Sequence, residues 1–195
     1  MKKILVTYAT NAGSTAKVAQ AVADEFAKTA DVDVLPLEQV TALGQYAAVV
    51  LGAPMILGWH RGAQAFLRRN QEALCRVPVA LFITCMSLAK TDDTIVDGVP
   101  LFVDEKLPFT PKNAGRLSLK ERYSTVTNYL RPVFKTAPRV KPVSVAFFGG
   151  SLQYFNLQWW AAIFALLIIQ APPGDKRNWG AISAWAGSLA GLLRL

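Results

Sequence analysis

The 195-residue sequence predicts an α/β fold with a doubly wound, five-stranded parallel sheet and helices on both of its faces. Short apolar runs alternate with segments whose apolar residues recur every three or four positions, as in amphipathic helices. The short runs are apolar on both sides, which is typical of buried parallel strands. Hydrophobic residues make up 52% of the chain and charged residues 17%, and this composition excludes a disordered protein. We expect one domain over residues 1–195, with an insertion after the fourth strand.

The first part of the chain predicts three strands and two helices. Residues 4–8 are β-branched, apolar or aromatic, as in a buried strand, and helical periodicity follows at residues 16–27. A proline closes the second strand at residues 32–37, and a glycine follows the third at residues 46–51. Residues 62–72 again show the spacing of a helix with one apolar face.

The second part of the chain completes the alternation of strands and helices. Residues 77–84 form an apolar strand, and residues 118–134 predict a helix that opens with a Ser-x-x-Glu capping box. The fifth strand, residues 143–148, ends at two glycines, and residues 182–193 predict a closing amphipathic helix. Ligands of doubly wound sheets bind beyond the carboxyl ends of the strands. Functional residues are therefore expected in the loops that follow these strands.

Two segments depart from the alternation. Residues 92–116 contain glycines and prolines without a clear period, and we expect an insertion or long loop. Residues 152–174 carry no charge, and an apolar helical segment is expected there. Within it, residues 157–171 are apolar almost all round, so a core helix, a dimer contact in a homo-oligomer and a peripheral membrane contact remain open.

Cysteine and histidine counts exclude several kinds of site. Cys75 and Cys85 cannot form a disulfide framework or a cysteine-rich zinc site, and His60 is the single histidine. We therefore expect no metal. The amino terminus lacks the long apolar stretch of a secretory signal, so we expect a cytoplasmic protein, with membrane association left open through residues 157–171.

The charge balance favours an anionic partner. Lysine and arginine total 21 and aspartate and glutamate 13, a net charge of +8. The basic residues are scattered and match no recognition motif, so no nucleic-acid partner is expected.

The loop at residues 10–15 combines three hydroxyl side chains, one glycine and the start of a helix. Backbone N–H groups, hydroxyls and a helix N-terminus together suit a phosphate group. The alternative is a plain helix cap. Because the loop follows the first parallel strand, we favour phosphate binding. The loop is neither a Walker loop nor a dinucleotide fingerprint, since it lacks Gly-Lys-Ser/Thr and has one glycine.

Three loops resemble those of a known superfamily. Residues 8–19 (YATNAGSTAKVA) are similar to the FMN phosphate loop of the flavodoxin superfamily, and residues 51–59 (LGAPMILGW) resemble its second FMN loop. Residues 85–88 fall where that superfamily has its third loop. Residues 148–154 (FGGSLQY), the Trp159–Trp160 pair and residues 177–179 resemble the flavodoxin-like menaquinone-dependent protoporphyrinogen IX dehydrogenases of haem synthesis.

The resemblance implies FMN as cofactor and assigns its contacts, while naming no catalytic residue. The phosphate would be held by Thr10, Asn11, Ala12, Gly13, Ser14 and Thr15; the isoalloxazine ring would contact Pro54, Met55, Ile56, Leu57, Gly58 and Trp59, with Ser87 and Leu88 at its opposite edge and Gly150, Leu152 and Tyr154 closing the site.

The expected function is an enzyme, an FMN-dependent oxidoreductase that passes electrons from an organic substrate, protoporphyrinogen IX being the candidate, to a quinone. The positive net charge favours this quinone-coupled role, because it would raise the flavin potential; the alternative, that the surface lysines and arginines serve solubility alone, stays open. Two alternatives stay open: a one-electron FMN carrier that docks on a redox partner, and a flavin-free interaction domain. We interpret His60 and Arg61 as surface residues at a helix start, and Cys85 as a buried inert thiol.

Overall fold

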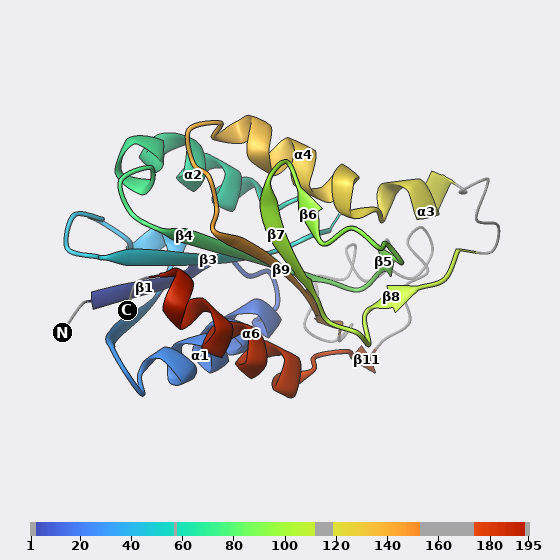
Figure 1. Ribbon diagram of the computed structural model, residues 1–195, viewed down its shortest axis with the longest axis horizontal. Helices are drawn as coiled ribbons and strands as arrows, with labels where there is room; N and C mark the ends of the chain where they lie inside the picture. Colours follow the sequence, from blue (N-terminus) through green and yellow to red (C-terminus); the bar gives the residue numbers. More distant parts are fainter. Residues whose placement is uncertain (1–2, 57, 112–118, 153–173, 194–195) are drawn as a thin grey trace.

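The computed structural model describes residues 3–56, 58–111, 119–152 and 174–193. Its central sheet has the predicted α/β architecture (Figure 1). Five parallel strands lie in the order β2-β1-β3-β4-β9, with every neighbouring pair parallel. Their bounds are β1 Lys3–Tyr8, β2 Asp31–Pro36, β3 Ala48–Pro54, β4 Val79–Cys85 and β9 Ser144–Gly149.

Part of the expected insertion extends this sheet. Strand β7 (Val99–Val103) pairs parallel with β9, and β6 (Ile95–Val96) pairs antiparallel with β7 at the sheet edge. A separate short pair joins β5 (Leu88–Ala89) to β8 (Pro108–Phe109). In its described part, residues 92–111, the expected insertion is therefore more than a plain loop. Pro100 obscured the strand in the sequence, and a proline is tolerated because β7 pairs with only a two-residue edge strand on that side.

Helices cover both faces of the sheet (Figure 1). One layer holds α1 (Ser14–Phe26) and α6 (Trp179–Leu192), and the other holds α2 (Arg61–Leu74) and α4 (Val126–Thr136). The helix expected at residues 118–134 is divided into α3 (Leu119–Tyr123) and α4. The division lies at Thr125, whose extended backbone and side chain, which accepts from Asn128 N at 3.3 Å, begin a new helix. A 3₁₀ turn, η1, spans Leu37–Gln39.

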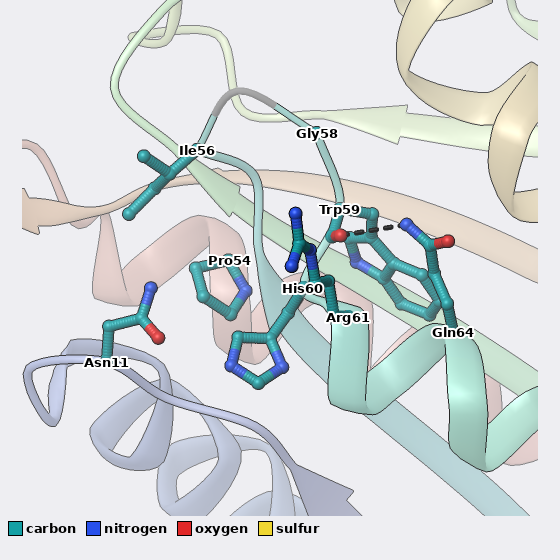
Figure 2. Close-up of a pocket in the computed structure, with 8 residues that line it drawn as sticks. All are labelled: Asn11, Pro54, Ile56, Gly58, Trp59, His60, Arg61 and Gln64. Atoms are coloured by element: carbon teal, nitrogen blue, oxygen red, sulfur yellow. Dashed lines mark hydrogen bonds between the residues drawn. The ribbon is translucent and has the colours of Figure 1, made fainter.

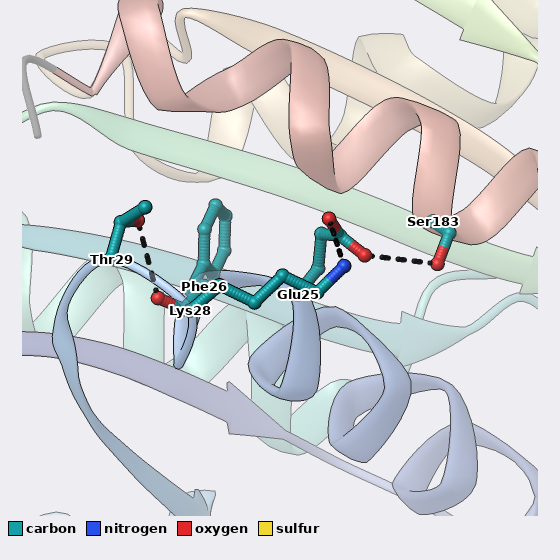
Figure 3. A network of polar contacts seen from close by, with 5 residues as sticks. All are labelled: Glu25, Phe26, Lys28, Thr29 and Ser183. Carbon is teal, nitrogen blue, oxygen red and sulfur yellow. Dashed lines mark hydrogen bonds and ion pairs between the residues drawn. The ribbon is translucent and has the colours of Figure 1, made fainter.

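The α1–α6 layer contains a small polar network at its surface (Figure 3). Glu25 accepts from Lys28 Nζ at 2.7 Å and from Ser183 Oγ at 3.2 Å. The second bond joins α1 to α6, residues that are far apart in the sequence.

Each face of the sheet has its own apolar core, because successive strand residues point to opposite faces. The core under α1 and α6 includes Phe82, Phe148 and Trp185, with Phe148 and Trp185 in an edge-on contact at 5.5 Å. The core under α2 and α4 includes Leu67 and Phe147. Trp185 also donates from Nε1 to Ser144 Oγ at 3.0 Å, so its one polar atom is satisfied.

The carboxyl ends of β1, β3, β4 and β9 meet at one edge of the sheet, where the sequence predicts ligand binding. A two-stranded pair of β10 (Ser151–Leu152) and β11 (Gly174–Asp175) lies after β9. The apolar segment expected at residues 152–174 falls outside the described residues for 153–173, and its contacts stay a prediction. In the portion that the structure describes, no helix has the length and apolar character to cross a bilayer.

Candidate functional site

The loop between β1 and α1 holds its own shape through one internal hydrogen bond. Gly13 N donates to Thr10 Oγ1 at 2.9 Å. Gly13 has φ 79°, in the left-handed region that favours glycine, and a Cβ there would meet no atom within 4 Å. Within the described ranges, no side chain caps α1 and no acidic residue lies in its first turn. The positive end of this helix therefore remains available to an anion.

The six residues predicted to hold a phosphate fall into two groups. Asn11 is exposed, and Thr10, Ala12, Gly13 and Ser14 are partly exposed on the loop; the sixth, Thr15, is fully buried. The hydroxyl of Thr15 lies 2.9 Å from that of Thr84, at the end of β4. This buried pair ties the start of α1 to the sheet, so the side chain of Thr15 points inward and only its backbone faces the loop.

The loop after β3 turns sharply back on itself. Met55 and Trp59 form an antiparallel bridge, and Ile56 N donates to Gly58 O at 3.0 Å. Gly58 has φ 125°, a conformation that side chains disfavour. His60 N closes the turn by donating to Pro54 O at 3.2 Å. Residues 54–56 and 58–60 therefore form a compact projection beside the β1–α1 loop.

A cavity of about 490 Å³ lies between these two loops (Figure 2). Its volume falls in the range of about 300–1,000 Å³ that is usual for small-molecule sites. Asn11 faces Pro54 and Ile56 across the cavity. No acidic side chain lines this cavity among the described residues, and its lining is Asn11, Pro54, Ile56, Gly58, Trp59, His60, Arg61 and Gln64.

Trp59 combines a cavity position with a core position. Its side chain is only 3% exposed and packs in the core under α2, yet it also lines the cavity. Its Nε1 is buried and has no hydrogen-bond partner among the described residues. Buried polar atoms are usually satisfied, so this indole N–H is a free donor in the wall next to the cavity.

Three cavity residues were not predicted as binding residues. His60 Nδ1 accepts from Gly62 N at 3.2 Å and caps α2, so the expected helix start is correct, and His60 and Arg61 also line the cavity. Gln64 donates to Trp59 O at 2.9 Å. Gln64 lies one helical turn after His60, and that spacing is the signal that could have identified it.

The remaining predicted residues lie beside the cavity or outside the described chain. Ser87 O accepts from Tyr129 Oη at 3.1 Å, and Leu88 is buried in β5; neither lines the cavity. Gly150 N donates to Cys85 O at 2.9 Å. Met55 is buried behind the turn, and Leu152 belongs to β10. Leu57 and Tyr154 are outside the described residues.

Residues 174–178 cover the end of β9. A Cβ on Gly149 would lie 2.0 Å from Lys176 O, so this close approach requires glycine. Lys176 Nζ donates to Met86 O at 3.0 Å, which brings a cation to the β4–β5 loop.

Two titratable groups of the described residues near this edge, Cys85 and Tyr129, are strongly affected by burial. Burial raises the pKa of the Cys85 thiol to about 12 and that of the Tyr129 phenol to about 12. Both groups are therefore neutral at physiological pH. No cluster of potential metal ligands occurs in the part of the chain that the structure describes.

Comparison with known proteins gives one family and several distant structures. A family model described as a flavodoxin domain matches residues 5–177. No curated protein sequence matches the chain significantly. Rubredoxin oxygen:oxidoreductase from Desulfovibrio gigas is 18% identical over 44% of this chain and 23% of that chain, with a TM-score of 0.39. The chain therefore spans less than a quarter of the length of that protein.

Two further solved structures are similar over more of their length. A flavodoxin from the domain Archaea is 12% identical over 100% of both chains, with a TM-score of 0.48. A mutant flavodoxin from Fusobacterium nucleatum, bound to flavin mononucleotide, is 13% identical over 74% of this chain and 68% of that chain, with a TM-score of 0.38.

Proposed function

Because the chain belongs to the flavodoxin domain family, we propose that it binds FMN at the carboxyl edge of its sheet and serves in electron transfer. The observation that carries this proposal is the cavity that joins Asn11, on the loop with phosphate-binding character, to the apolar turn of residues 54–56 and 58–59. A ligand with a phosphate at one end and a flat apolar ring at the other matches this arrangement.

The phosphate end would be bound without a lysine or arginine. The hydroxyls of Thr10 and Ser14 and the N–H groups of the first turn of α1 would supply the donors, since all of them belong to this loop and the helix start that follows it. Gly13 leaves the space that a side chain would otherwise fill. The absence of a side-chain cap among the described residues means that a bound phosphate would itself complete the helix terminus.

The ring end would be shaped by Pro54, Ile56 and Trp59, with the backbone of Gly58 at the turn. Bound FMN supplies reversible uptake of one or two electrons. The chain's own contribution is to orient the ring, exclude water along the apolar wall and provide hydrogen-bond donors. The unpartnered Nε1 of Trp59 is one such donor beside the cavity.

A quinone-coupled oxidation of an organic substrate is the second, more specific candidate. Arg61 places a cation at the cavity, and no acidic residue opposes it among the described lining residues. That charge favours additional negative charge in the cavity and would also bind a carboxylate of a substrate such as protoporphyrinogen IX. A one-electron carrier would need no such substrate contact.

Cofactor binding is tested by titrating the protein with FMN and following quenching of flavin fluorescence. We expect one FMN per chain. Gly13→Glu places a negative charge at the start of α1 and should weaken FMN binding at least about tenfold. Gly98→Glu is the matched control, because Gly98 has the same φ of 79°, is exposed with open space around it and lies outside the site. Equal affinity in both variants, or no FMN binding by the parent protein, would contradict the proposal.

The more specific candidate is tested with FMN-loaded protein under anaerobic conditions. Oxidation of protoporphyrinogen IX that depends on added menaquinone supports the quinone-coupled enzyme. Arg61→Gln should then raise KM for the substrate more than it lowers kcat, since Arg61 would act in binding. Rapid electron exchange with a protein partner and no turnover of the porphyrinogen would support the carrier instead.

A further inference from the structure

The positive charge of the described residues is concentrated on one helical layer. The α2–α4 layer and the loops that leave its helices carry eight exposed basic residues and, within residues 61–76 and 126–141, one acidic residue, Glu72. We call this surface the basic face; it consists of Arg61, Arg68, Arg69, Arg76, Arg131, Lys135, Arg139 and Lys141.

The opposite layer has no such excess. On α1 and the turn that follows it, Lys17 and Lys28 are balanced by Asp24 and Glu25. Helix α6 carries no charged residue. The charge asymmetry therefore belongs to one side of the molecule, the side on which α2 and α4 lie next to each other (Figure 1).

Most positive charges of the basic face have no ion-pair partner among the described residues. Among the residues that the structure describes, its one ion pair joins Arg139 to Glu72 at 3.2 Å. Arg61 and Arg68 lie seven residues apart, so they share one side of α2, and Arg76 follows the end of the helix. Arg131 and Lys135 lie four residues apart on α4, a spacing at which like charges repel. The basic face therefore presents positive charge that is largely unpaired within the described residues, and an acidic partner would reduce this repulsion.

The composition of the basic face favours a protein over a lipid surface. Six of its eight cations are arginine, which is enriched in protein interfaces and pairs with carboxylates in a bidentate manner. Of the large apolar side chains exposed in the described ranges, none lies on α2 or α4, so this face offers nothing to insert into a bilayer. Tyr123, at the end of α3, is 74% exposed beside the face, and tyrosine with arginine is a frequent pair in interface hot spots.

The basic face reaches the cavity. Arg61 is the first residue of α2 and also lines the cavity, whereas Arg76 follows the other end of the helix, about 21 Å away for a 14-residue helix. A partner bound along α2 would therefore contact the cavity rim with one end.

We propose that the basic face of α2 and α4 is a docking surface for an acidic protein, which binds with one end at the cavity formed by the β1–α1 and β3–α2 loops. Complementary charge would steer the encounter and make it sensitive to salt. The interface would be small and transient, as is usual where long-range attraction dominates over apolar burial. This docking does not depend on the flavin, so it can fail or succeed independently of the proposed function.

The test measures binding of an acidic probe protein, a plant-type [2Fe–2S] ferredoxin, by biolayer interferometry at about 20 mM and about 200 mM NaCl. We expect binding at low salt and about tenfold weaker binding at high salt. Arg68→Glu with Arg69→Glu should weaken the low-salt affinity at least about tenfold. The milder pair Arg68→Gln with Arg69→Gln should fall between this variant and the parent protein. Both side chains are exposed and make no hydrogen bond or ion pair with the described residues, so the fold should be retained, and circular dichroism checks this.

The matched control is Lys28→Glu with Lys106→Glu, which changes the net charge by the same amount on exposed residues outside the basic face and away from the cavity. It should change the affinity less than about threefold. Equal weakening by both pairs would show that net charge alone is responsible and would overturn the proposal. Failure to bind ferredoxin, together with binding to phosphatidylglycerol vesicles that the Arg68 and Arg69 substitutions abolish, would overturn it in favour of a lipid surface.

Discussion

At the scale of single residues, the two thiols lie in opposite environments. Cys85 is buried at the end of β4, and this burial raises its pKa to about 12. Cys75 is exposed at the end of α2. A thiolate, not a thiol, attacks disulfide reagents, so only the exposed cysteine should react in the folded protein.

We therefore expect Ellman's reagent at about pH 8 to label one thiol rapidly and the second only after unfolding. Cys75→Ser should abolish the rapid phase and leave the fold unchanged. Rapid labelling of Cys85 in that variant would contradict the burial of this residue and reopen a redox role for it.

Asp33 connects three elements at the amino edge of the sheet and makes a pH-dependent contribution to stability. Its carboxylate accepts from Tyr46 Oη at 2.6 Å and lies 3.0 Å from Lys3 Nζ. The hydrogen bond from Tyr46, with a smaller contribution from Lys3, holds the pKa of Asp33 below its ordinary value of 3.8. A lowered folded-state pKa means that the stabilisation is present above the ordinary value and is lost as the pH falls through the folded value.

Asp33→Asn should therefore reduce stability at neutral pH and flatten the loss of stability below about pH 4. Thermal unfolding followed between about pH 7 and pH 3 measures both effects. Tyr46→Phe should act in the same direction, since it removes the main cause of the lowered pKa. An unchanged acid profile in Asp33→Asn would assign the acid sensitivity to other carboxylates.

At the scale of elements, strand β3 depends on a glycine that the sequence offered only as a turn signal. A Cβ on Gly52 would lie 1.8 Å from Phe82 Cζ, because the buried ring of Phe82 on β4 packs directly over the β3 backbone. Gly52→Ala should destabilise the protein by about 1–3 kcal/mol through overpacking. Gly44→Ala, in open space, should change stability by less than about 1 kcal/mol.

Guanidinium unfolding of the two alanine variants measures the difference. The double substitution Gly52→Ala with Phe82→Leu provides a further check, because the shorter side chain removes the clash. It should cost less than the sum of the single changes. A mild effect of Gly52→Ala alone would show that the Phe82 ring can move aside.

The sequence predicts some elements well for identifiable reasons. The strands at β1, β3, β4 and β9 are buried on both faces and therefore read as unbroken apolar runs. Strand β7 was missed because Pro100 interrupts it and because its residues are only partly buried at the sheet edge. The break between α3 and α4 was missed because nothing in the sequence distinguishes Thr125 from an ordinary residue inside a helix. Its side chain caps α4 by accepting from Asn128 N, and only the structure shows this bond.

In the candidate site too, features set by neighbouring residues could be predicted, whereas features set by distant contacts could not. The β1–α1 loop was predictable because its hydroxyls, glycine and helix start are contiguous in sequence. The inward turn of Thr15 depends on Thr84, 69 residues away, and the cavity positions of His60 and Gln64 depend on how α2 packs beside the turn. Such contacts between distant segments leave no periodic signal in one sequence.

At the scale of the whole molecule, the two apolar cores share a single sheet. Leu189 of α6 is fully buried on one face, and Leu67 of α2 is buried on the other. Every strand of the parallel sheet contributes side chains to one or both cores, so neither core can dissolve while the other keeps its sheet intact. This arrangement predicts one cooperative unfolding transition, as is usual for a single domain of this size.

Leu189→Ala and Leu67→Ala should each lower the free energy of unfolding by about 2–5 kcal/mol, through lost burial and a residual cavity. Each variant should shift the whole transition and leave it single when guanidinium unfolding is followed by circular dichroism and by tryptophan fluorescence. Leu192→Ala is the matched control on α6, because Leu192 is 47% exposed, and it should cost less than about 0.5 kcal/mol. If Leu189→Ala instead separates the two signals into two transitions, the α1–α6 layer unfolds on its own and the shared-sheet argument is wrong. Coincident signals in both variants would establish that the sheet couples the layer bearing α1 to the layer bearing the basic face.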